Sequence, residues 1–95
     1  MTNLLQTLGL AYKGKRILIG EDVIKDLPKN KIKLIILAND VSENTLKRYQ
    51  DKANHYQVEL IQMFSKEELG QALGKDLVAA IGIKDENLKN KVLIK

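Results

Sequence analysis

The sequence contains no cysteine, a single histidine (His55) and a single proline (Pro28). Without cysteine, the chain can form neither a disulfide framework nor a zinc site of the thiolate type. One histidine cannot build a histidine-rich metal site, and it cannot act as the relay of a catalytic triad without partners. We therefore expect no metal, no cofactor and no enzymatic activity.

Aromatic residues and long apolar runs are also scarce. Aromatic side chains make up 4% of the 95 residues, which is few for a platform that stacks the bases of single-stranded nucleic acid. No apolar run approaches the roughly 20 residues that span a bilayer. The first residues carry no basic group ahead of their apolar side chains, so no signal peptide is expected. These absences favour a cytoplasmic protein with no membrane partner.

Basic residues are abundant by contrast, and the net charge is +4 at neutral pH. A basic balance in so small a chain favours an anionic partner, because each lysine placed on a phosphate releases a condensed counterion. The alternative is that the lysines only keep a small protein in solution. Net charge by itself does not separate these two interpretations.

Strand-like and helix-like patterns alternate along the chain, which we interpret as one domain over residues 1–95. Helices are predicted at residues 3–12, 21–29, 43–56, 66–73 and 85–95, and strands at residues 16–19, 33–37, 57–63 and 77–83. Ser42 is predicted to cap one helix, and a capping box of Ser65 and Glu68 is predicted to open another. Pro28 disfavours a regular helix beyond Leu27.

The stretch from Lys33 to Thr45 makes the fold class readable. Leu34–Leu37 is a continuous apolar run, typical of a strand covered on both faces. Asn39 and Asp40 then favour a turn, and a capped helix follows. This alternation predicts a three-layer α/β/α sandwich with a small, largely parallel sheet, in which the short first strand pairs antiparallel at one side. Ligands of such sheets gather near the carboxyl ends of strands.

Nucleotide and small-molecule sites are poorly matched. Gly9–Lys15 has the glycine and lysine spacing of a phosphate loop, but a helix precedes it and Arg16 replaces the hydroxyl residue that binds magnesium. Gly70–Lys75 is one residue short and also lacks the hydroxyl. An enzyme site near Asn39 and Asp40 would require a deep pocket.

Two other segments, Gly20–Lys25 and Gly74–Val78, are predicted to meet at one edge of the sandwich. The first opens a helix after the first strand, and the second lies just before the last strand. The backbone N–H groups of a helix start can bind phosphate, while Glu21 and Asp22 can accept hydrogen bonds from base edges. The alternative is that these acids only stabilise a helix end and the lysines are solvated. The cations expected around Gly20 are Lys15, Lys25, Lys29, Lys31 and Lys33.

The run LIILAND with its capped helix and the later run LGQALGKDLVAAIGI together resemble the kink-turn RNA-binding superfamily of ribosomal proteins. This superfamily includes archaeal ribosomal protein L-seven-Ae and the thirtieth eukaryotic large-subunit protein, and the likeness is greatest to a bacterial YlxQ-like branch. It covers the chain from Leu4 to Val92. The resemblance implies an α/β fold, a three-layer α/β/α sandwich with a four-stranded mixed central sheet. It also implies recognition of a kink-turn, a helix–bulge–helix of RNA with tandem sheared G·A pairs.

The resemblance also implies which residues touch the RNA. In the family, a Gly-x-Asn-Glu-x-x-Lys segment opens the second helix and reads the sheared pairs. Aligned without gaps, Glu21 stands at the asparagine, Asp22 at the glutamate and Lys25 at the lysine. Ile19 then replaces the glycine, and a shift of one residue would instead pair Gly20 with it. Glu21 cannot donate the hydrogen bonds that an asparagine amide gives.

A second family contact is an apolar loop before the last strand, which covers the flipped-out nucleotide of the bulge. Asp76, Leu77 and Val78 occupy that loop here. We therefore expect a protein that is monomeric when free and binds structured RNA, with ribosomal RNA as a candidate. Glu21, Asp22 and Lys25 are expected to contact bases, and the residues expected on phosphates are Lys15, Lys29, Lys31 and Lys33. The alternative is a translation-associated protein–protein adaptor on the same fold, with a degenerate RNA site.

Overall fold

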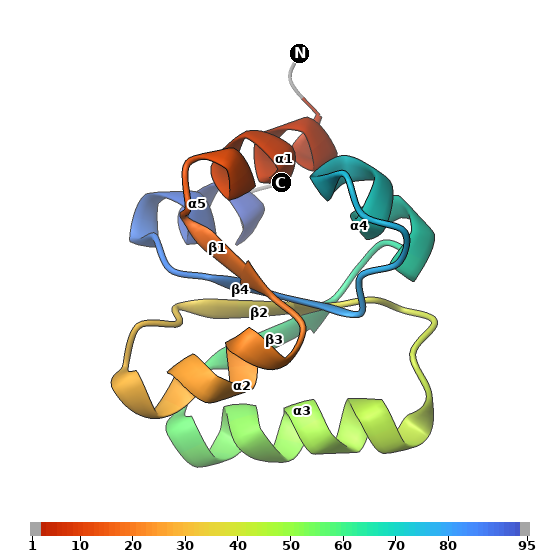
Figure 1. Cartoon of the computed structure of the whole chain (residues 1–95). Coiled ribbons are helices and arrows are strands. Elements are labelled where there is room, and N and C mark those ends of the chain that lie inside the picture. Colours follow the sequence, from red (N-terminus) through yellow and green to blue (C-terminus); the bar gives the residue numbers. More distant parts are fainter. Residues whose placement is uncertain (1–2, 94–95) are drawn as a thin grey trace.

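The computed structural model describes residues 3–93, which alternate between helices and strands (Figure 1). The helices are α1 (Leu4–Lys13), α2 (Glu21–Asp26), α3 (Glu43–Tyr56), α4 (Lys66–Leu73) and α5 (Glu86–Leu93), and a 3₁₀ turn, η1 (Leu27–Lys29), follows α2. The strands are β1 (Ile17–Ile19), β2 (Leu34–Leu37), β3 (Glu59–Gln62) and β4 (Ala80–Ile83). Each predicted helix and strand is present; α3 and α4 have the predicted bounds, and the other elements have shifted ends. The last residues of the predicted final helix, 94 and 95, lie outside the described residues.

The four strands form one mixed sheet in the order β1-β4-β2-β3. β4 runs antiparallel to both β1 and β2, and β2 runs parallel to β3. The four-stranded mixed sheet implied by the family resemblance is confirmed, whereas the largely parallel sheet inferred from pattern alone is wrong. The physical reason is the register, in which Ala80 lies opposite Leu37, so β4 starts where β2 ends and runs back alongside it.

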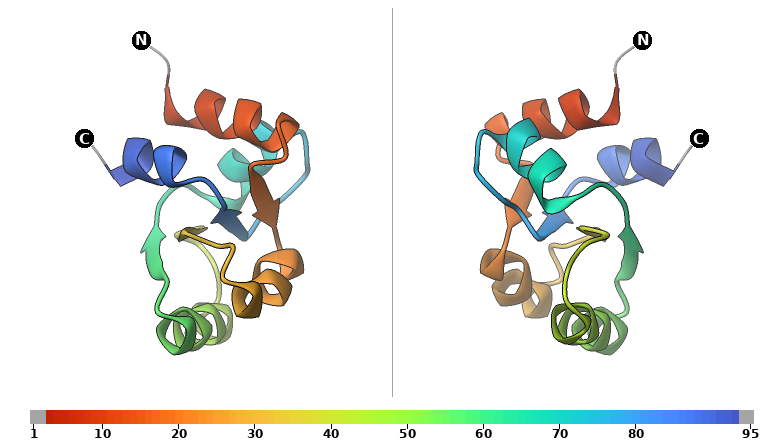
Figure 2. Two further views of the ribbon diagram at one scale, coloured as in Figure 1. Left: turned by 90° about the vertical axis from the view of Figure 1, so that its left-hand side faces the viewer. Right: turned by 90° about the vertical axis from the view of Figure 1, so that its right-hand side faces the viewer.

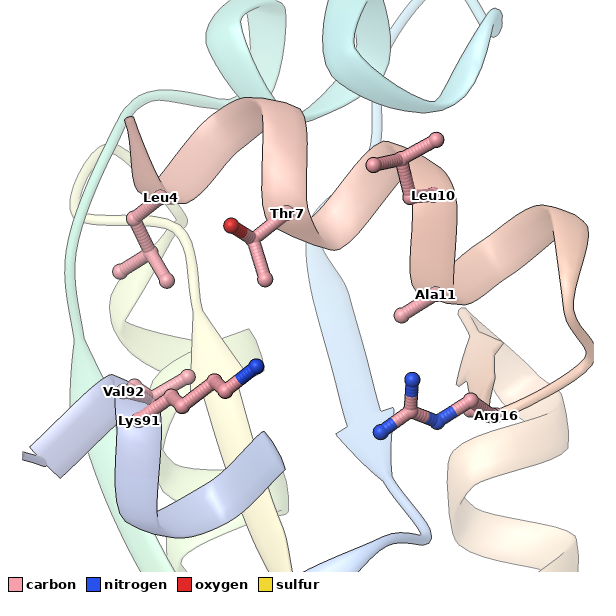
Figure 3. Close-up of a pocket in the computed structure, with 7 residues that line it drawn as sticks. All are labelled: Leu4, Thr7, Leu10, Ala11, Arg16, Lys91 and Val92. Carbon is pink, nitrogen blue, oxygen red and sulfur yellow. The ribbon is translucent and has the colours of Figure 1, made fainter. Parts of the chain in front are cut away.

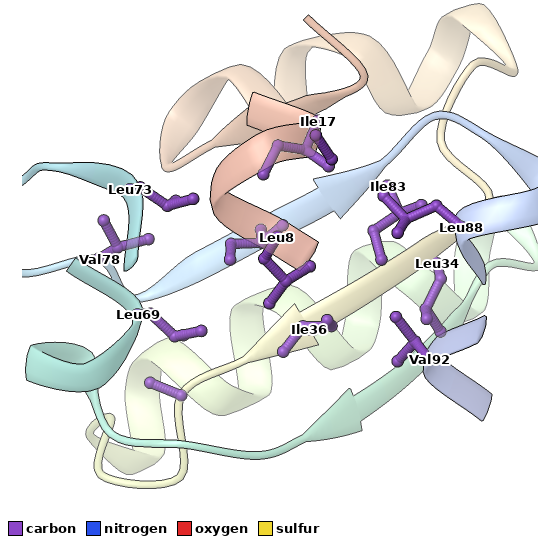
Figure 4. Packing of buried hydrophobic residues seen from close by; sticks show 13 residues of the cluster. Leu8, Ile17, Leu34, Ile36, Leu69, Leu73, Val78, Ile83, Leu88 and Val92 are labelled. Atoms are coloured by element: carbon purple, nitrogen blue, oxygen red, sulfur yellow. The ribbon is translucent and has the colours of Figure 1, made fainter. Parts of the chain in front are cut away.

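Helices cover both faces of the sheet, so the predicted three-layer sandwich is confirmed (Figures 1 and 2). α1, α4 and α5 pack on one face, and α2 and α3 on the other. Strand β2 explains why the core has two halves, because its four apolar side chains are fully buried and alternate between the faces. Leu34 and Ile36 join the cluster drawn in Figure 4, and Ile35 and Leu37 join the opposite one.

The helix starts follow the predicted capping residues. The Ser42 hydroxyl accepts a hydrogen bond from the Thr45 N–H at 3.2 Å. Ser65 and Glu68 form the reciprocal capping box, with hydrogen bonds of 3.0 and 2.9 Å. These contacts satisfy N–H groups that the first turn of a helix leaves without partners.

The last strand begins three residues later than predicted. Leu77 was expected to start it, but Leu77 is 62% exposed and the strand starts at Ala80. The cause is the close approach of the α4–β4 loop to Gly70: the Lys75 N–H donates to the Gly70 carbonyl at 2.7 Å, and a Cβ on Gly70 would overlap the carbonyl oxygen of Asp76. This loop is therefore held on α4 before the chain enters the sheet.

Candidate nucleic-acid interface

The sheet register brings the two predicted RNA-contacting segments together. Ile19 pairs with Ile81, and the Gly20 N–H donates to the Ala80 carbonyl at 3.0 Å. The end of β1 therefore touches the start of β4, and Leu77 lies only three residues before Ala80, within about 10 Å along the chain. We call this region the Gly20 edge. It comprises Gly20, Glu21, Asp22, Lys25 and Leu77.

The turn at Gly20 is fixed from both sides. Its backbone has φ 61° and ψ −136°, a conformation that is strained for any residue with a Cβ. The Ala80 carbonyl accepts a hydrogen bond from the Gly20 N–H, and the Tyr49 hydroxyl donates one to the Gly20 carbonyl at 3.1 Å. Burial raises the pKa of Tyr49, and the nearby Glu21 carboxylate raises it further. The Tyr49 hydroxyl therefore stays a protonated donor at neutral pH, and the start of α2 is anchored on α3.

Arg48, on α3, also reaches this edge, although no sequence pattern predicted it. Arg48 Nη1 lies 2.8 Å from Glu21 Oε1, with 52% of the arginine side chain and 59% of the glutamate side chain exposed. The hydrogen bond from Arg48 to Glu21, with the attraction of the carboxylate, raises the pKa of the guanidinium. The two residues are 27 positions apart in the sequence. No local pattern links them, so only the packing of α3 beside α2 could reveal the pair.

Asp22 and Lys25 complete the polar part of the Gly20 edge. Both are exposed and lie in the short helix α2, one turn apart. Within residues 3–93 neither side chain forms an ion pair with the protein. An acceptor and a cation are thus presented to solvent beside the Glu21–Arg48 pair.

The three predicted loop residues lie in different environments. Leu77 projects outward, whereas Val78 is 4% exposed and belongs to the core under α4. The Val78 N–H also donates to the Lys66 carbonyl at 3.1 Å. Asp76 is exposed and follows the backbone held against Gly70. The structure therefore leaves Leu77 as the apolar side chain that a base could contact, and the burial of Val78 speaks against such a contact there.

The expected ring of lysines around Gly20 is not what the structure shows. Lys33 precedes β2 and its N–H donates to the Ile83 carbonyl at 2.6 Å, at the far end of β4 from Ala80. The Lys84 N–H donates to the Arg16 carbonyl at 3.0 Å beside them. We call this opposite end the Lys33 edge. Its basic residues flank β1, β4 and β2 and are Lys15, Arg16, Lys33 and Lys84.

Two other predicted lysines, Lys29 and Lys31, also lie away from the start of α2. Lys29 is the last residue of η1 and Lys31 lies between η1 and β2, and Lys29 Nζ lies 3.4 Å from Asp26 Oδ1. A helix of six residues rises about 9 Å, so this connection is separated from Gly20 by the length of α2. Of the predicted cations, only Lys25 belongs to the Gly20 edge.

Asn39 and Asp40 serve the backbone. The Asn39 N–H donates to the Phe64 carbonyl at 2.8 Å, and Asp40 Oδ1 accepts from the Lys66 N–H at 2.9 Å at the start of α4.

The hollows found among the described residues lie away from Asn39 and Asp40. One, of about 650 Å³ between α1 and α5, is lined by Leu4, Leu10, Arg16 and Lys91 among others (Figure 3).

The described residues contain neither a cluster of metal ligands nor a helix that could span a membrane. Across residues 3–93, histidine and acidic side chains do not gather in threes as a metal ion would need. In the same part of the chain, every helix is too short or too polar to cross a bilayer.

Sequence comparisons identify relatives along nearly the whole chain. The model of the ribosomal protein L7Ae/L30e/S12e/Gadd45 family matches residues 2–93. RNA-binding protein YlxQ of Bacillus subtilis is 36% identical over 87 residues, which are 90% of this chain and 87% of the relative. RNA-binding protein YlxQ of Enterococcus faecium is 36% identical over 85 residues, which are 88% of this chain and 82% of the relative.

Solved structures agree in fold. A protein of unknown function from Bacillus halodurans C superposes with a TM-score of 0.88 at 32% identity, covering 97% of this chain and 94% of its own. The 15.5 kD RNA-binding protein of Giardia lamblia superposes with a TM-score of 0.75 at 21% identity, covering 94% and 78%. At that identity the second likeness concerns the fold alone.

Proposed function

The chain belongs to the ribosomal protein L7Ae/L30e/S12e/Gadd45 family, and from this we propose that it is a non-enzymatic protein that binds structured RNA. The RNA that we propose is a kink-turn with sheared G·A pairs. We further propose that residues 1–95 act as one domain, monomeric when free, in the translation machinery of the cytoplasm. The names of the two bacterial relatives support RNA binding in general terms.

One observation carries the proposal beyond the family. The hydrogen bond from the Gly20 N–H to the Ala80 carbonyl places the start of α2 beside the loop that carries Leu77. Polar groups that suit base edges and an exposed apolar side chain that suits an unstacked base are thus presented together. A kinked RNA offers both features at one point, whereas a regular A-form helix has a major groove too narrow for side chains.

The chemistry divides between the residues of the Gly20 edge. The carboxylates of Glu21 and Asp22 accept hydrogen bonds from amino and imino groups of guanine. Lys25 donates to an acceptor on a base or a phosphate, and Leu77 covers the bulged base. Since Leu77 is already 62% exposed, it can make this contact without leaving the core.

The Lys33 edge is proposed to act differently, through phosphates alone. Lysines at this end attract RNA without reading sequence, because phosphate contacts position a nucleic acid and base contacts specify it. Their contribution depends on salt through counterion release. We propose this role for Lys15 and Lys33 of this edge, and also for Lys29 and Lys31, which lie between α2 and β2.

The test is a titration against a kink-turn RNA and against the same RNA with its G·A pairs changed to Watson–Crick pairs, each at two salt concentrations. We expect tight binding that is lost when the G·A pairs are changed. Equal and steeply salt-dependent affinity for both RNAs would overturn kink-turn recognition and leave general phosphate attraction.

A protein–protein adaptor on the same fold is the second candidate. It is favoured by Leu10 on α1, which is 67% exposed and lines the hollows between α1 and both α5 and α4. An adaptor that binds its partner through Leu10 would lose its association with ribosomal particles in Leu10→Ser, measured by co-sedimentation. Unchanged co-sedimentation would remove Leu10 from any such interface.

A further inference from the structure

The Glu21–Arg48 ion pair is not needed to hold α3 against the start of α2. Tyr49, the next residue, is only 5% exposed and donates its hydroxyl to the Gly20 carbonyl, so it already fixes α3 against the start of α2. Ala53, one turn further, is also buried in that layer. An exposed ion pair between half-open side chains adds little stability. The fold therefore does not explain why Arg48 is held at this edge.

The chemistry of the Gly20 edge is one-sided without Arg48. The carboxylates of Glu21 and Asp22 can only accept hydrogen bonds. Lys25 is then the only charged donor among the five residues that define the edge. A purine edge that carries acceptors, such as O6 and N7 of guanine, requires donors in fixed positions.

Arg48 can supply those donors. A guanidinium has five N–H groups in a planar fork, and the hydrogen bond to Glu21 Oε1 uses one of them. In residues 3–93 its guanidinium has no other side-chain carboxylate partner. Glu21 limits the freedom of the long side chain, so less entropy is lost when a base is bound.

We propose that Arg48 is a base-reading residue of this protein: held by Glu21, its guanidinium binds O6 and N7 of a guanine in the sheared pairs. Glu21 positions the Arg48 guanidinium in addition to its proposed role as an acceptor, and Arg48 donates to O6 and N7 of the base. This inference rests on the proposed recognition of G·A pairs. It adds α3 to the α2 start and the Leu77 loop as a third part of the interface.

The experiment compares wild type with Arg48→Ala on a kink-turn RNA in which each guanosine of the sheared pairs is replaced in turn by 7-deazaguanosine, which lacks the N7 acceptor. We expect Arg48→Ala to weaken binding about tenfold on the unmodified RNA, the scale of a lost hydrogen bond to a charged group. At one guanosine, the deaza substitution should weaken wild type and leave Arg48→Ala unaffected.

Three further variants separate base reading from charge and from folding. Lys52→Ala removes an exposed lysine one turn beyond Arg48 on α3 and should keep the wild-type response to deaza substitution. Arg48→Lys keeps the charge without the fork, so it should become insensitive to the deaza substitution like Arg48→Ala. Glu21→Gln should weaken binding more in wild type than in the Arg48→Ala background, because only wild type also loses the positioning of Arg48.

The outcomes also separate this inference from the proposed function. If wild type discriminates against Watson–Crick pairs but Arg48→Ala responds to every deaza substitution as wild type does, the role of Arg48 is overturned and kink-turn recognition stands. The role of Arg48 is also overturned if Arg48→Ala lowers the unfolding temperature and reduces the affinity for the kink-turn and for the Watson–Crick control by the same factor. If wild type does not discriminate between the two RNAs, the proposed function fails and this inference fails with it.

Discussion

The two ends of the sheet differ in the kind of charge they present. The Gly20 edge carries both acidic and basic side chains. Glu21 forms an ion pair with Arg48 at 2.8 Å, and Asp22 and Lys25 lie beside this pair. At the Lys33 edge, Asp85 pairs with Arg16, and further lysines flank the neighbouring strands. Over the three residue steps from Ala80 to Ile83, about 10 Å, the surface changes from mixed charge to predominantly basic.

This difference separates selectivity from attraction. Mixed donors and acceptors in fixed positions can discriminate between bases, whereas a basic surface attracts any polyanion. The Gly20 edge also carries the exposed apolar side chain of Leu77, whereas the residues that define the Lys33 edge are all basic. Changes at the Gly20 edge are therefore expected to alter which RNA is bound, and changes at the Lys33 edge to alter how strongly all RNAs are bound.

The largest expected effect is that of Gly70→Ala, which changes the Gly20 edge indirectly, by displacing the loop that carries Leu77. A Cβ at Gly70 would overlap the Asp76 carbonyl, so the Leu77 loop must shift. We expect a loss of about 1–3 kcal/mol of unfolding free energy and a loss of selectivity between the two RNAs, measured by chemical denaturation and titration. The matched control is Gly14→Ala, where an added Cβ meets neighbours only at 3.6 Å or more. Unchanged selectivity in Gly70→Ala would show that the loop does not contribute.

Lys25→Ala should have the next largest effect. The side chain is exposed and outside the core, so the unfolding midpoint should stay within the range of surface substitutions. Affinity for the kink-turn should fall about tenfold, because a charge-assisted contact is lost. Lys47→Ala, an exposed lysine on α3, serves as the control. Wild-type affinity in the Lys25 variant would remove this residue from the interface.

Leu77→Ser tests the apolar contact at the same edge. We expect binding to weaken several-fold without loss of stability, since a half-exposed leucine contributes part of the ~2 kcal/mol of a fully buried one. Leu10→Ser is a close match, because Leu10 is 67% exposed and lies on α1. The two variants should differ in RNA titration, and equal affinities would refute the assigned role of Leu77.

Lys15→Ala combined with Lys33→Ala tests the opposite end. Affinity should fall by a similar factor for the kink-turn and for the Watson–Crick control, which leaves their ratio unchanged. The slope of log affinity against log salt should decrease by about one per lysine that contacts phosphate. A change in the ratio between the RNAs would contradict the division between the two edges.

The smallest effect concerns the pH dependence of the Lys33 edge. The hydrogen bond from Arg16 holds the pKa of Asp85 below its usual value, although desolvation opposes this. A carboxyl group whose pKa is lower in the folded than in the unfolded protein stabilises the fold. This stabilisation is fully present above the unfolded pKa of about 3.9 and is lost as the pH falls through the folded pKa. Asp85→Asn should therefore melt slightly lower than wild type at neutral pH, and the gap should close in strong acid. A gap that is independent of pH would exclude this ion pair as its source.

Local features of the fold could be predicted because they depend on residues near one another in the chain. Leu34–Leu37 indicated a strand buried on both faces, and all four side chains are fully buried. Ser42 and the Ser65–Glu68 pair indicated helix starts, and both caps are formed. Gly20 was placed at the end of the first strand, where its positive φ is observed. Each of these signals spans a few residues, as helix and strand periods do.

The helices, the strands, their caps and the family therefore follow from the order of the amino acids. The antiparallel course of β4 along β2, the position of Lys15 and Lys33 at the opposite end from Gly20, and the contact of Arg48 with Glu21 follow from the folding of the whole chain. These outcomes depend on where a distant strand enters the sheet and on how helices pack across its face. Such register and packing are set by burial of the whole apolar surface, which no short pattern encodes.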